Sequence, residues 1–332
     1  MAAHLTPKEN LLRVYAGEIP EWVPWGYEGF ANVVAPPGLG FDFSAPPAPE
    51  FEDMFGVPMV MEWKSGPIPK PNVFILDDIT KWRDVIKRPP ILDEIDWELG
   101  CSKVLAERDP ELIKYCMGSL GNGYFMFLTY VMGMTNAMIA CMEEPEEVKA
   151  LLNFICDLNI ETSKKLMYYL KPDVMLLGDD IAHEREPFVS EAMFLDIFEP
   201  VWRRNTQVFR EGGCFAQHHN CGRIEPFIPW IVDMGNNAWD PAQQSNDLYA
   251  IKWKYDNKFV ICGGLENNGF ICWPETSDEE VRAEVKRVMD LLAPGGGFAF
   301  GGMVMGAMDD EFANARSALI RDEYEKNMYN YY

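Results

Sequence analysis

The sequence predicts an α/β protein folded as a (β/α)₈ TIM barrel, preceded by an irregular N-terminal extension rich in proline and aromatic residues. From about residue 110 onward, short strand-like runs alternate with long amphipathic helical patterns. Such alternation indicates a parallel sheet, because a parallel connection needs a crossover of helix length. The 332 residues show no flexible linker after residue 110, which favours one barrel over two domains. An open doubly wound sheet is the alternative, but no G-x-G-x-x-G turn follows a strand.

Residues 111–332 are expected to form the main part of a single barrel domain, and they contain six strand-like runs. The runs are Ile113–Gly118, Asp173–Gly178, Gly213–Gln217, Asn237–Asp240, Phe259–Gly263 and Phe298–Gly301. Two earlier runs, Val57–Glu62 and Val73–Leu76, would bring the count to the eight strands of a closed barrel.

Long helices are expected between the strands of the main part, each after a plausible capping residue. They cover Glu146–Leu170, Ser190–Glu211 and Asp278–Leu292. Ser277 can cap the last of these, and acidic residues follow it in the first turn, where the helix dipole favours negative charge.

Residues 1–110 are expected to be an extension that covers the barrel, with helices only at Pro7–Tyr15 and around Ile79–Lys87. The many aromatic residues can pack as a cover over a core. They can also line a pocket for a flat apolar ligand, and we assign Trp25 and Tyr27 to substrate binding on that basis.

The acidic composition excludes several classes of partner. The chain has 29 Lys+Arg against 52 Asp+Glu, a net charge of −23, which argues against binding to nucleic acid or to anionic membranes. No apolar run reaches the roughly 18 residues that span a bilayer, and the N-terminus has no secretion signal. Eight cysteines are too sparse for a disulfide scaffold, so we expect a cytoplasmic protein.

Residues that can bind ligands gather where the predicted strands end. In a (β/α)₈ barrel the active site lies at this carboxyl end of the strands, so the clustering predicts a site. In chain order the residues are Asp179, Asp180, His183, His218, His219, Cys221, Asp240, Cys262 and Glu266.

The His219-Asn220-Cys221 segment is the sharpest candidate for a metal site. Side chains two residues apart on an extended segment point to the same side, so His219 and Cys221 can reach one ion at about 2.0–2.3 Å. Imidazole and thiolate together suit Zn²⁺ in a reducing compartment. The alternative is a buried cysteine beside a structural histidine, but the neighbouring carboxylates favour the metal site.

The remaining zinc ligands are less well specified. Cys262 ends another strand and is the preferred third ligand, although it could equally be a small apolar strand residue. Glu266 or Asp240 could supply an oxygen ligand, with one position left open for substrate. We also assign His218 and Asp240 to substrate binding.

The pair Asp179-Asp180 could act in acid–base chemistry, bind a cation or cap the helix that leads to Pro187. Adjacent residues at a strand end face opposite ways, so we expect only one of the two carboxylates to enter the site. Asp180 and His183 are the candidate catalytic residues, as proton donors.

Four segments together resemble the uroporphyrinogen decarboxylase-like superfamily, most specifically in the H-x-C-G that follows a central strand. The resemblance covers roughly residues 110–325 and is closer to the branch of zinc- and corrinoid-dependent methyltransferases. The segments are KPDVMLLGDDIAHEREPFVSEAMFLDIFEPVWRR, QHHNCGRIEPFIPWIVDMGNNAWDPAQ, KYDNKFVICGGLENNG and PGGGFAFGG.

This resemblance implies a (β/α)₈ barrel with zinc held by His219, Cys221 and a later cysteine. In the coenzyme M methyltransferases that cysteine follows the last strand, where this chain has Gly302-Met303, which argues against a thiol-methylating member. Porphyrinogen decarboxylases carry an arginine-rich N-terminal signature. The corresponding stretch here, EIPEWVPWGYEGF, has no arginine, so decarboxylation of a polyanionic porphyrinogen is not expected.

The resemblance further implies transfer of a methyl group from a small-molecule donor to the cob(I)alamin of a separate corrinoid carrier protein. Among such enzymes, O-demethylases of phenyl methyl ethers fit best, because a flat uncharged ether suits the aromatic N-terminal segment. Zinc would assist the leaving oxygen as a Lewis acid. Other methyl donors or acceptors, such as amines and thiols, and a non-catalytic corrinoid-binding protein are the alternatives. The oligomeric state stays open, with a homodimer as one option.

Overall fold

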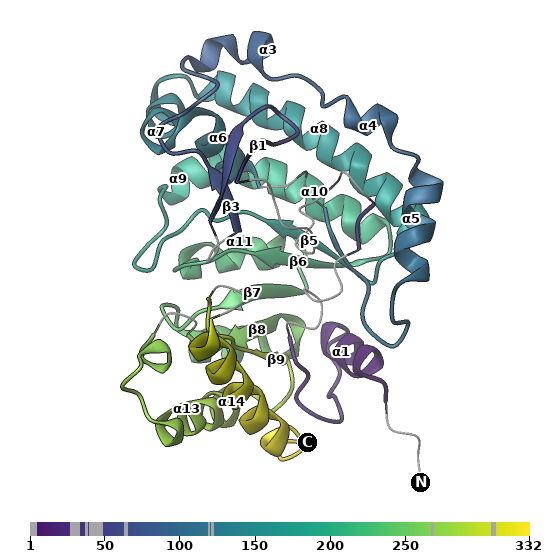
Figure 1. The fold of residues 1–332 in the computed structure, drawn as a ribbon, viewed down its shortest axis with the longest axis vertical. Coiled ribbons are helices and arrows are strands. Elements are labelled where there is room, and N and C mark those ends of the chain that lie inside the picture. The colour runs from purple at the N-terminus through teal and green to yellow at the C-terminus, as the bar shows by residue number, and fades with distance from the viewer. Residues whose placement is uncertain are drawn as a thin grey trace.

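A parallel six-stranded sheet forms the centre of the molecule (Figure 1). The computed structural model describes residues 5–26, 34–36, 39, 49–62, 66–118, 120, 123–266, 269–306 and 310–332. The strands pair in chain order, and all six predicted runs of the main part are confirmed. They are β4 Tyr115–Met117, β5 Val174–Gly178, β6 Phe215–His219, β7 Ala238–Ala242, β8 Val260–Gly264 and β9 Phe298–Gly301.

The N-terminal segment lies along both edges of this sheet. At the β9 edge, the Gly26 N–H donates to the Phe300 carbonyl at 2.6 Å, and Trp25 forms a parallel bridge with Phe300. At the β4 edge, the Val34 N–H donates to the Tyr115 carbonyl at 2.8 Å. Gly26 and Val34 therefore contact the two opposite edges of the sheet.

The prediction that Val57–Glu62 and Val73–Leu76 complete the barrel is wrong. Strand β2 (Pro58–Glu62) pairs antiparallel with β1 (Glu50–Glu52) and β3 (Gly66–Pro69) in a separate three-stranded sheet. The link from β2 to β3 is far too short for a parallel crossover, so a hairpin forms instead. Residues 73–76 form no strand, and the N–H groups of Ile75 and Leu76 both donate to the Val131 carbonyl.

The predicted helices of the extension are confirmed, and their capping residues explain where they begin. Thr6 and Glu9 form a capping box at the start of α1 (Pro7–Tyr15). The segment around Ile79–Lys87 is a 3₁₀ turn followed by α3 (Trp82–Val85), and the Asp78 side chain accepts from the Thr80 N–H. The prediction of only two helical segments here is wrong, because α4 (Ile91–Glu94) and α5 (Trp97–Ala106) follow, and the Asp96 side chain caps α5.

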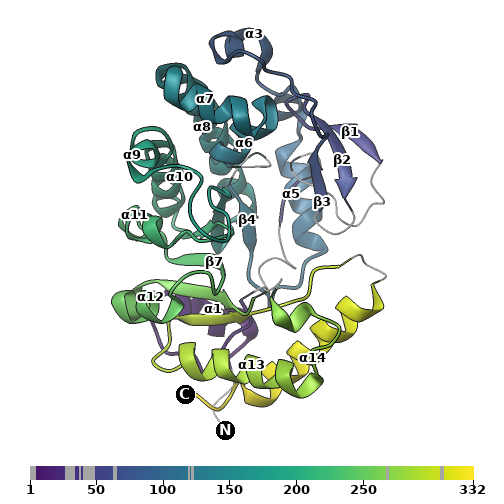
Figure 2. The same cartoon turned by 90° about the vertical axis from the view of Figure 1, so that its left-hand side faces the viewer.

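The long helices of the main part pack on the outer face of the curved sheet, with α8 and α10 near β5 and β6, and α13 and α14 near β8 and β9 (Figures 1 and 2). The run Ser190–Glu211 is divided into α9, a π-helical turn over Phe194–Phe198, and α10. The Ser277 capping box precedes α13, as predicted. The helices are α6 Tyr124–Met132, α7 Met134–Glu143, α8 Pro145–Leu170, α9 Glu191–Met193, α10 Glu199–Glu211, α11 Ile228–Asp233, α12 Leu248–Tyr255, α13 Asp278–Leu292 and α14 Glu311–Asn327.

Helix α1 closes the amino end of the sheet and forms a small apolar core with it. Leu11 and Val14 of α1 are buried against alternate strand residues, among them Val174 and Leu176 of β5. The intervening residues Met175 and Leu177 belong to the larger core under the helices. Apolar side chains therefore bury both faces of the sheet. The polar residues at the carboxyl ends of the strands are the ones that can form a functional site.

Within the part of the chain that the structure describes, no single helix has the length and apolar character needed to cross a membrane. Helices α6 and α7 have that length and apolar character only when they are counted as one segment, and a bend of 111° separates them. All eight cysteines are free thiols, as the sequence predicts.

Candidate metal centre

Asp180, His219 and Cys221 come together at the carboxyl ends of β5 and β6. One ligand atom of each lies within 4.8 Å of the others, and no other such group of three occurs among the described residues. His219 Nε2 is 3.9 Å from Cys221 Sγ and 3.9 Å from Asp180 Oδ1. Neighbouring ligands of a tetrahedral zinc ion are about 3.3–3.6 Å apart. Small side-chain movements would therefore bring these three atoms to zinc-binding distances.

The loop after β6 places Cys221 in this group. The Cys221 N–H donates to Asp180 Oδ1 at 2.7 Å, and the next N–H, of Gly222, donates to Gln243 Oε1 at 2.6 Å. Gly222 has a φ of +81°, and a Cβ there would lie 2.7 Å from the Ala182 carbonyl oxygen. The glycine of the H-x-C-G motif is thus required by a tight turn against the loop that follows β5.

Asp240 of β7 orients the His219 ring. His219 Nδ1 lies 2.6 Å from Asp240 Oδ2, and the Asp240 side chain is almost fully buried. A carboxylate accepts the Nδ1 proton, so the Nε2 atom is the one that can bind a metal. Metal-binding histidines commonly have such a carboxylate partner.

Protonation of His219 and Cys221 would compete with metal binding. Burial lowers the pKa of His219, but Asp240 and Cys221 together raise it, and the net pKa lies well above the usual value. Burial raises the pKa of the Cys221 thiol, and the adjacent His219 opposes this rise. A metal ion would therefore displace protons when it binds, and its affinity should fall at low pH.

The neighbouring Asp179 has a structural role, which confirms that only one carboxylate of the pair faces the site. Its side chain is buried and accepts hydrogen bonds from the first three N–H groups of α6 and from the Trp202 indole, at 2.9–3.0 Å. Asp179 thus caps α6 and not the segment before Pro187. Burial raises the pKa of Asp179 to about 6. A Cβ on Gly123, just before α6, would overlap the Asp179 side chain.

His218 and Cys262 do not lie with the metal centre. His218 is on the opposite face of β6, where its ring centroid lies 4.2 Å from that of Trp202, and burial lowers its pKa to about 3. Cys262 is fully buried in the core closed by α1, where burial raises the pKa of its thiol.

Glu266 and His183 are near the loops of the site but outside the group of three. Glu266 accepts hydrogen bonds from Gln243 Nε2 at 3.3 Å and from the Gln244 N–H at 3.2 Å. It therefore supports Gln243, which holds the loop of Cys221. His183 Nδ1 accepts from the Arg185 N–H at 3.2 Å within its own loop.

Of the two aromatic residues assigned to substrate binding, the structure describes only Trp25. Trp25 packs against Phe300 and Tyr324, with ring centroids 5.5 Å and 5.0 Å away, and Arg321 of α14 lies over its ring. Trp25 therefore faces the outer helix α14. Tyr27 lies outside the described residues.

Gln217 and Tyr15 contribute to the site but were missed from the sequence. Gln217 could have been found, because it lies two residues before His219 on the same strand face. Tyr15 reaches the site from the N-terminal helix, and no local pattern marks it. Gln243 directly follows β7, at the strand end where the sequence places ligand-binding residues.

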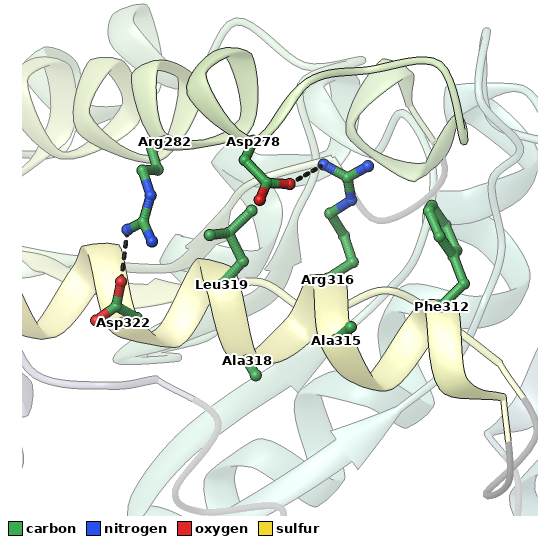
Figure 3. Close-up of a pocket in the computed structure, with 8 residues that line it drawn as sticks. All are labelled: Asp278, Arg282, Phe312, Ala315, Arg316, Ala318, Leu319 and Asp322. Carbon is green, nitrogen blue, oxygen red and sulfur yellow. Dashed lines mark ion pairs between the residues drawn. The ribbon is translucent and has the colours of Figure 1, made fainter.

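A groove of about 360 Å³ lies away from the metal centre, between α13 and α14 (Figure 3). Its charged residues pair with one another: Arg282 lies 2.5 Å from Asp322, and Arg316 lies 3.6 Å from Asp278. These ion pairs satisfy the charges of the groove without a ligand.

The fold and site together define a parallel α/β protein with a candidate metal site, Asp180, His219 and Cys221, at the carboxyl ends of its strands. The chain belongs to the uroporphyrinogen decarboxylase (URO-D) family, whose profile matches residues 51–308, well over half of its length. This family has the (β/α)₈ barrel fold, so the predicted fold class is confirmed.

A solved structure supports the same fold. It is a methyltransferase from Methanosarcina mazei, which is 13% identical in sequence and superposes with a TM-score of 0.66. The alignment covers 97% of this chain and 100% of that one. Among curated protein sequences, none matches this chain at a significant level.

Proposed function

We propose that this protein is a methyltransferase that moves a methyl group from a phenyl methyl ether to the cob(I)alamin of a separate corrinoid protein. The observation that carries the proposal is the group Asp180, His219 and Cys221 at the carboxyl end of a URO-D family barrel. The similar fold of a methyltransferase from Methanosarcina mazei supports it. The cytoplasmic location and the homodimer stay predictions.

The three side chains suit Zn²⁺, because one imidazole, one thiolate and one carboxylate are all ligands that this ion accepts. A bound zinc ion would supply Lewis acidity to the ether oxygen at its fourth position. Asp240 keeps the His219 ring oriented through the contact of 2.6 Å. Asp180 also fixes the Cys221 loop through the backbone N–H of that residue.

The reaction requires charge to be stabilised on oxygen. The electron pair of cobalt(I) forms the new bond to the methyl carbon, while the bond from carbon to oxygen breaks and its electrons stay on the phenolate. The phenolate then takes up a proton, and His183, in the loop beside Gly222, is a candidate donor. An aryl oxide without such assistance is a poor leaving group, which explains the need for a cation in the site.

The side chains of the site argue against two other functions, a porphyrinogen decarboxylase and a methyltransferase that acts on thiols. The partly exposed Asp180 carboxylate would repel a substrate with several carboxylates, which disfavours a porphyrinogen decarboxylase. A zinc site that activates thiols for methylation needs more than one thiolate. Here Cys221 is the single cysteine in the group of three, and Cys262 lies in the core below it.

The test is an assay of cob(I)alamin methylation with purified, zinc-loaded protein. Methoxybenzene or a ring-substituted relative is added under anoxic conditions, and the loss of the cob(I)alamin absorption is followed together with the release of phenol. We expect methylation that depends on protein, and a rate lower by at least about 100-fold in His219→Ala. Methanol and a trimethylated amine serve as comparison donors. Equal rates in wild type and His219→Ala, or methylation only from the comparison donors, would refute the proposal.

A further inference from the structure

A line of buried polar side chains runs from α1 through the core of the sheet to the metal centre. It consists of Tyr15, Gln217, Asp240 and His219. The first three are at most 5% exposed. Apolar residues such as Val14, Leu176 and Ala238 surround the lower part of the line. Leucine or methionine could fill this space without any cost of burying polar groups, so the presence of hydrogen-bonding groups there calls for an explanation.

Each member of the line bonds to the next. The Tyr15 hydroxyl donates to Gln217 Oε1, and Gln217 Nε2 donates to Asp240 Oδ1. The other oxygen of that carboxylate, Oδ2, accepts from His219 Nδ1 at 2.6 Å. The contact of Tyr15 with Gln217 joins residues 202 positions apart in the sequence, so the line connects the N-terminal helix to the candidate zinc ligand.

The direction of these hydrogen bonds follows from the chemistry of the groups. A carboxylate can only accept, so Asp240 requires an N–H on both sides. Gln217 must then turn its amide nitrogen toward Asp240, which leaves its oxygen for Tyr15. The tyrosine hydroxyl can donate to that oxygen, and the amide is held in one orientation.

The strand register makes this arrangement possible. β6 and β7 pair His219 directly with Asp240, and Gln217 lies two residues earlier on the same face of β6. Gln217 and His219 therefore both face Asp240, one on each carboxylate oxygen. A carboxylate bonded on both sides cannot rotate, and the His219 ring bonded to it keeps Nε2 directed toward Cys221 and Asp180.

We propose that Tyr15 and Gln217 are positioning residues for the metal centre, which hold the Asp240 carboxylate so that it orients His219. The inference rests on the zinc site of the proposed function, but it does not depend on which methyl donor is used. Tyr15 bonds to Gln217 and Gln217 to Asp240, so both act on His219 through the Asp240 carboxylate.

Zinc affinity tests this inference, measured by competition with a chromophoric chelator. Gln217→Met removes both hydrogen bonds at nearly constant volume, and we expect zinc binding weaker by about 10–100-fold. Tyr15→Phe removes only the hydroxyl, and we expect a smaller loss of about 3–10-fold. In Co²⁺-substituted protein, both variants should also shift the visible absorption bands of the metal.

Tyr124→Phe is the matched control. The Tyr124 hydroxyl is also buried and also donates to a side-chain amide oxygen, that of Asn205, but it lies in the helix layer away from the metal centre. Its loss should cost a similar free energy of unfolding, of about 1 kcal/mol, and leave zinc affinity and the Co²⁺ spectrum unchanged.

The outcomes separate this inference from the proposed function. Folded Gln217→Met and Tyr15→Phe proteins with wild-type zinc affinity would overturn the positioning role, as would an equal loss of affinity in Tyr124→Phe. Wild-type protein that binds no zinc would overturn the metal centre and this inference with it. Zinc binding that responds as expected, without methyl transfer in the cob(I)alamin assay, would refute only the proposed reaction.

Discussion

Replacing Cys221 with alanine is expected to abolish stoichiometric zinc binding, whereas the same replacement of Cys262 is expected to leave it intact. Cys221 Sγ lies 3.9 Å from His219 Nε2, while Cys262 is enclosed by the apolar core beside α1. Loss of one of three protein ligands should weaken zinc binding by at least about 1,000-fold, which corresponds to about 4 kcal/mol. Metal analysis of each variant after dialysis against a weak chelator measures this.

His219→Ala and His218→Ala form a second matched pair for the same prediction. The two histidines are adjacent, but they lie on opposite faces of β6, and His218 packs on Trp202. We expect zinc to be lost only from His219→Ala. Retention of zinc in both Cys221→Ala and His219→Ala, or its loss from Cys262→Ala while that protein stays folded, would contradict the assignment of ligands.

Alanine substitutions of the adjacent aspartates should differ in effect: one should lower the stability of the fold, and the other should weaken metal binding. Asp179→Ala would leave four buried N–H donors without their acceptor, three at the start of α6 and one on Trp202. We expect the free energy of unfolding to fall by about 3 kcal/mol or more. Asp180 is only partly buried and is expected to contribute little to stability, but Asp180→Ala removes one of the three candidate ligands and should weaken zinc binding by at least about 1,000-fold.

Urea unfolding of the metal-free proteins measures the first effect, and chelator competition measures the second. The metal-free state is the appropriate one, because bound zinc would itself stabilise the folded protein. A large loss of stability in Asp180→Ala with none in Asp179→Ala would show that the roles of the two carboxylates are reversed.

The sequence alone identified the central pair of the site, because a strand places alternate residues on one face. This rule brought His219 and Cys221 together, and it also predicted that only one of Asp179 and Asp180 faces the site. This rule does not say how far along the barrel axis a side chain lies. Cys262 is on the inner face of β8, but the strand continues to Gly264, so the thiol lies in the core below the metal centre.

The long-range features of the site and fold could not be predicted from local patterns. Val57–Glu62 has the composition of a strand, but composition does not state whether its partner is parallel or antiparallel. The contact of Tyr15 with Gln217 depends on how α1 packs under the sheet, and the contact of Gln217 with Asp240 depends on the register of β6 and β7. Both are tertiary features without a sequence signature.

X-ray absorption at the zinc edge of the purified, zinc-loaded protein tests the central claim most directly. The arrangement of Asp180, His219 and Cys221 predicts a single sulfur ligand at about 2.3 Å and nitrogen or oxygen ligands at about 2.0–2.2 Å, with an imidazole contribution. A zinc site with two or more sulfur ligands, or with none, would contradict it.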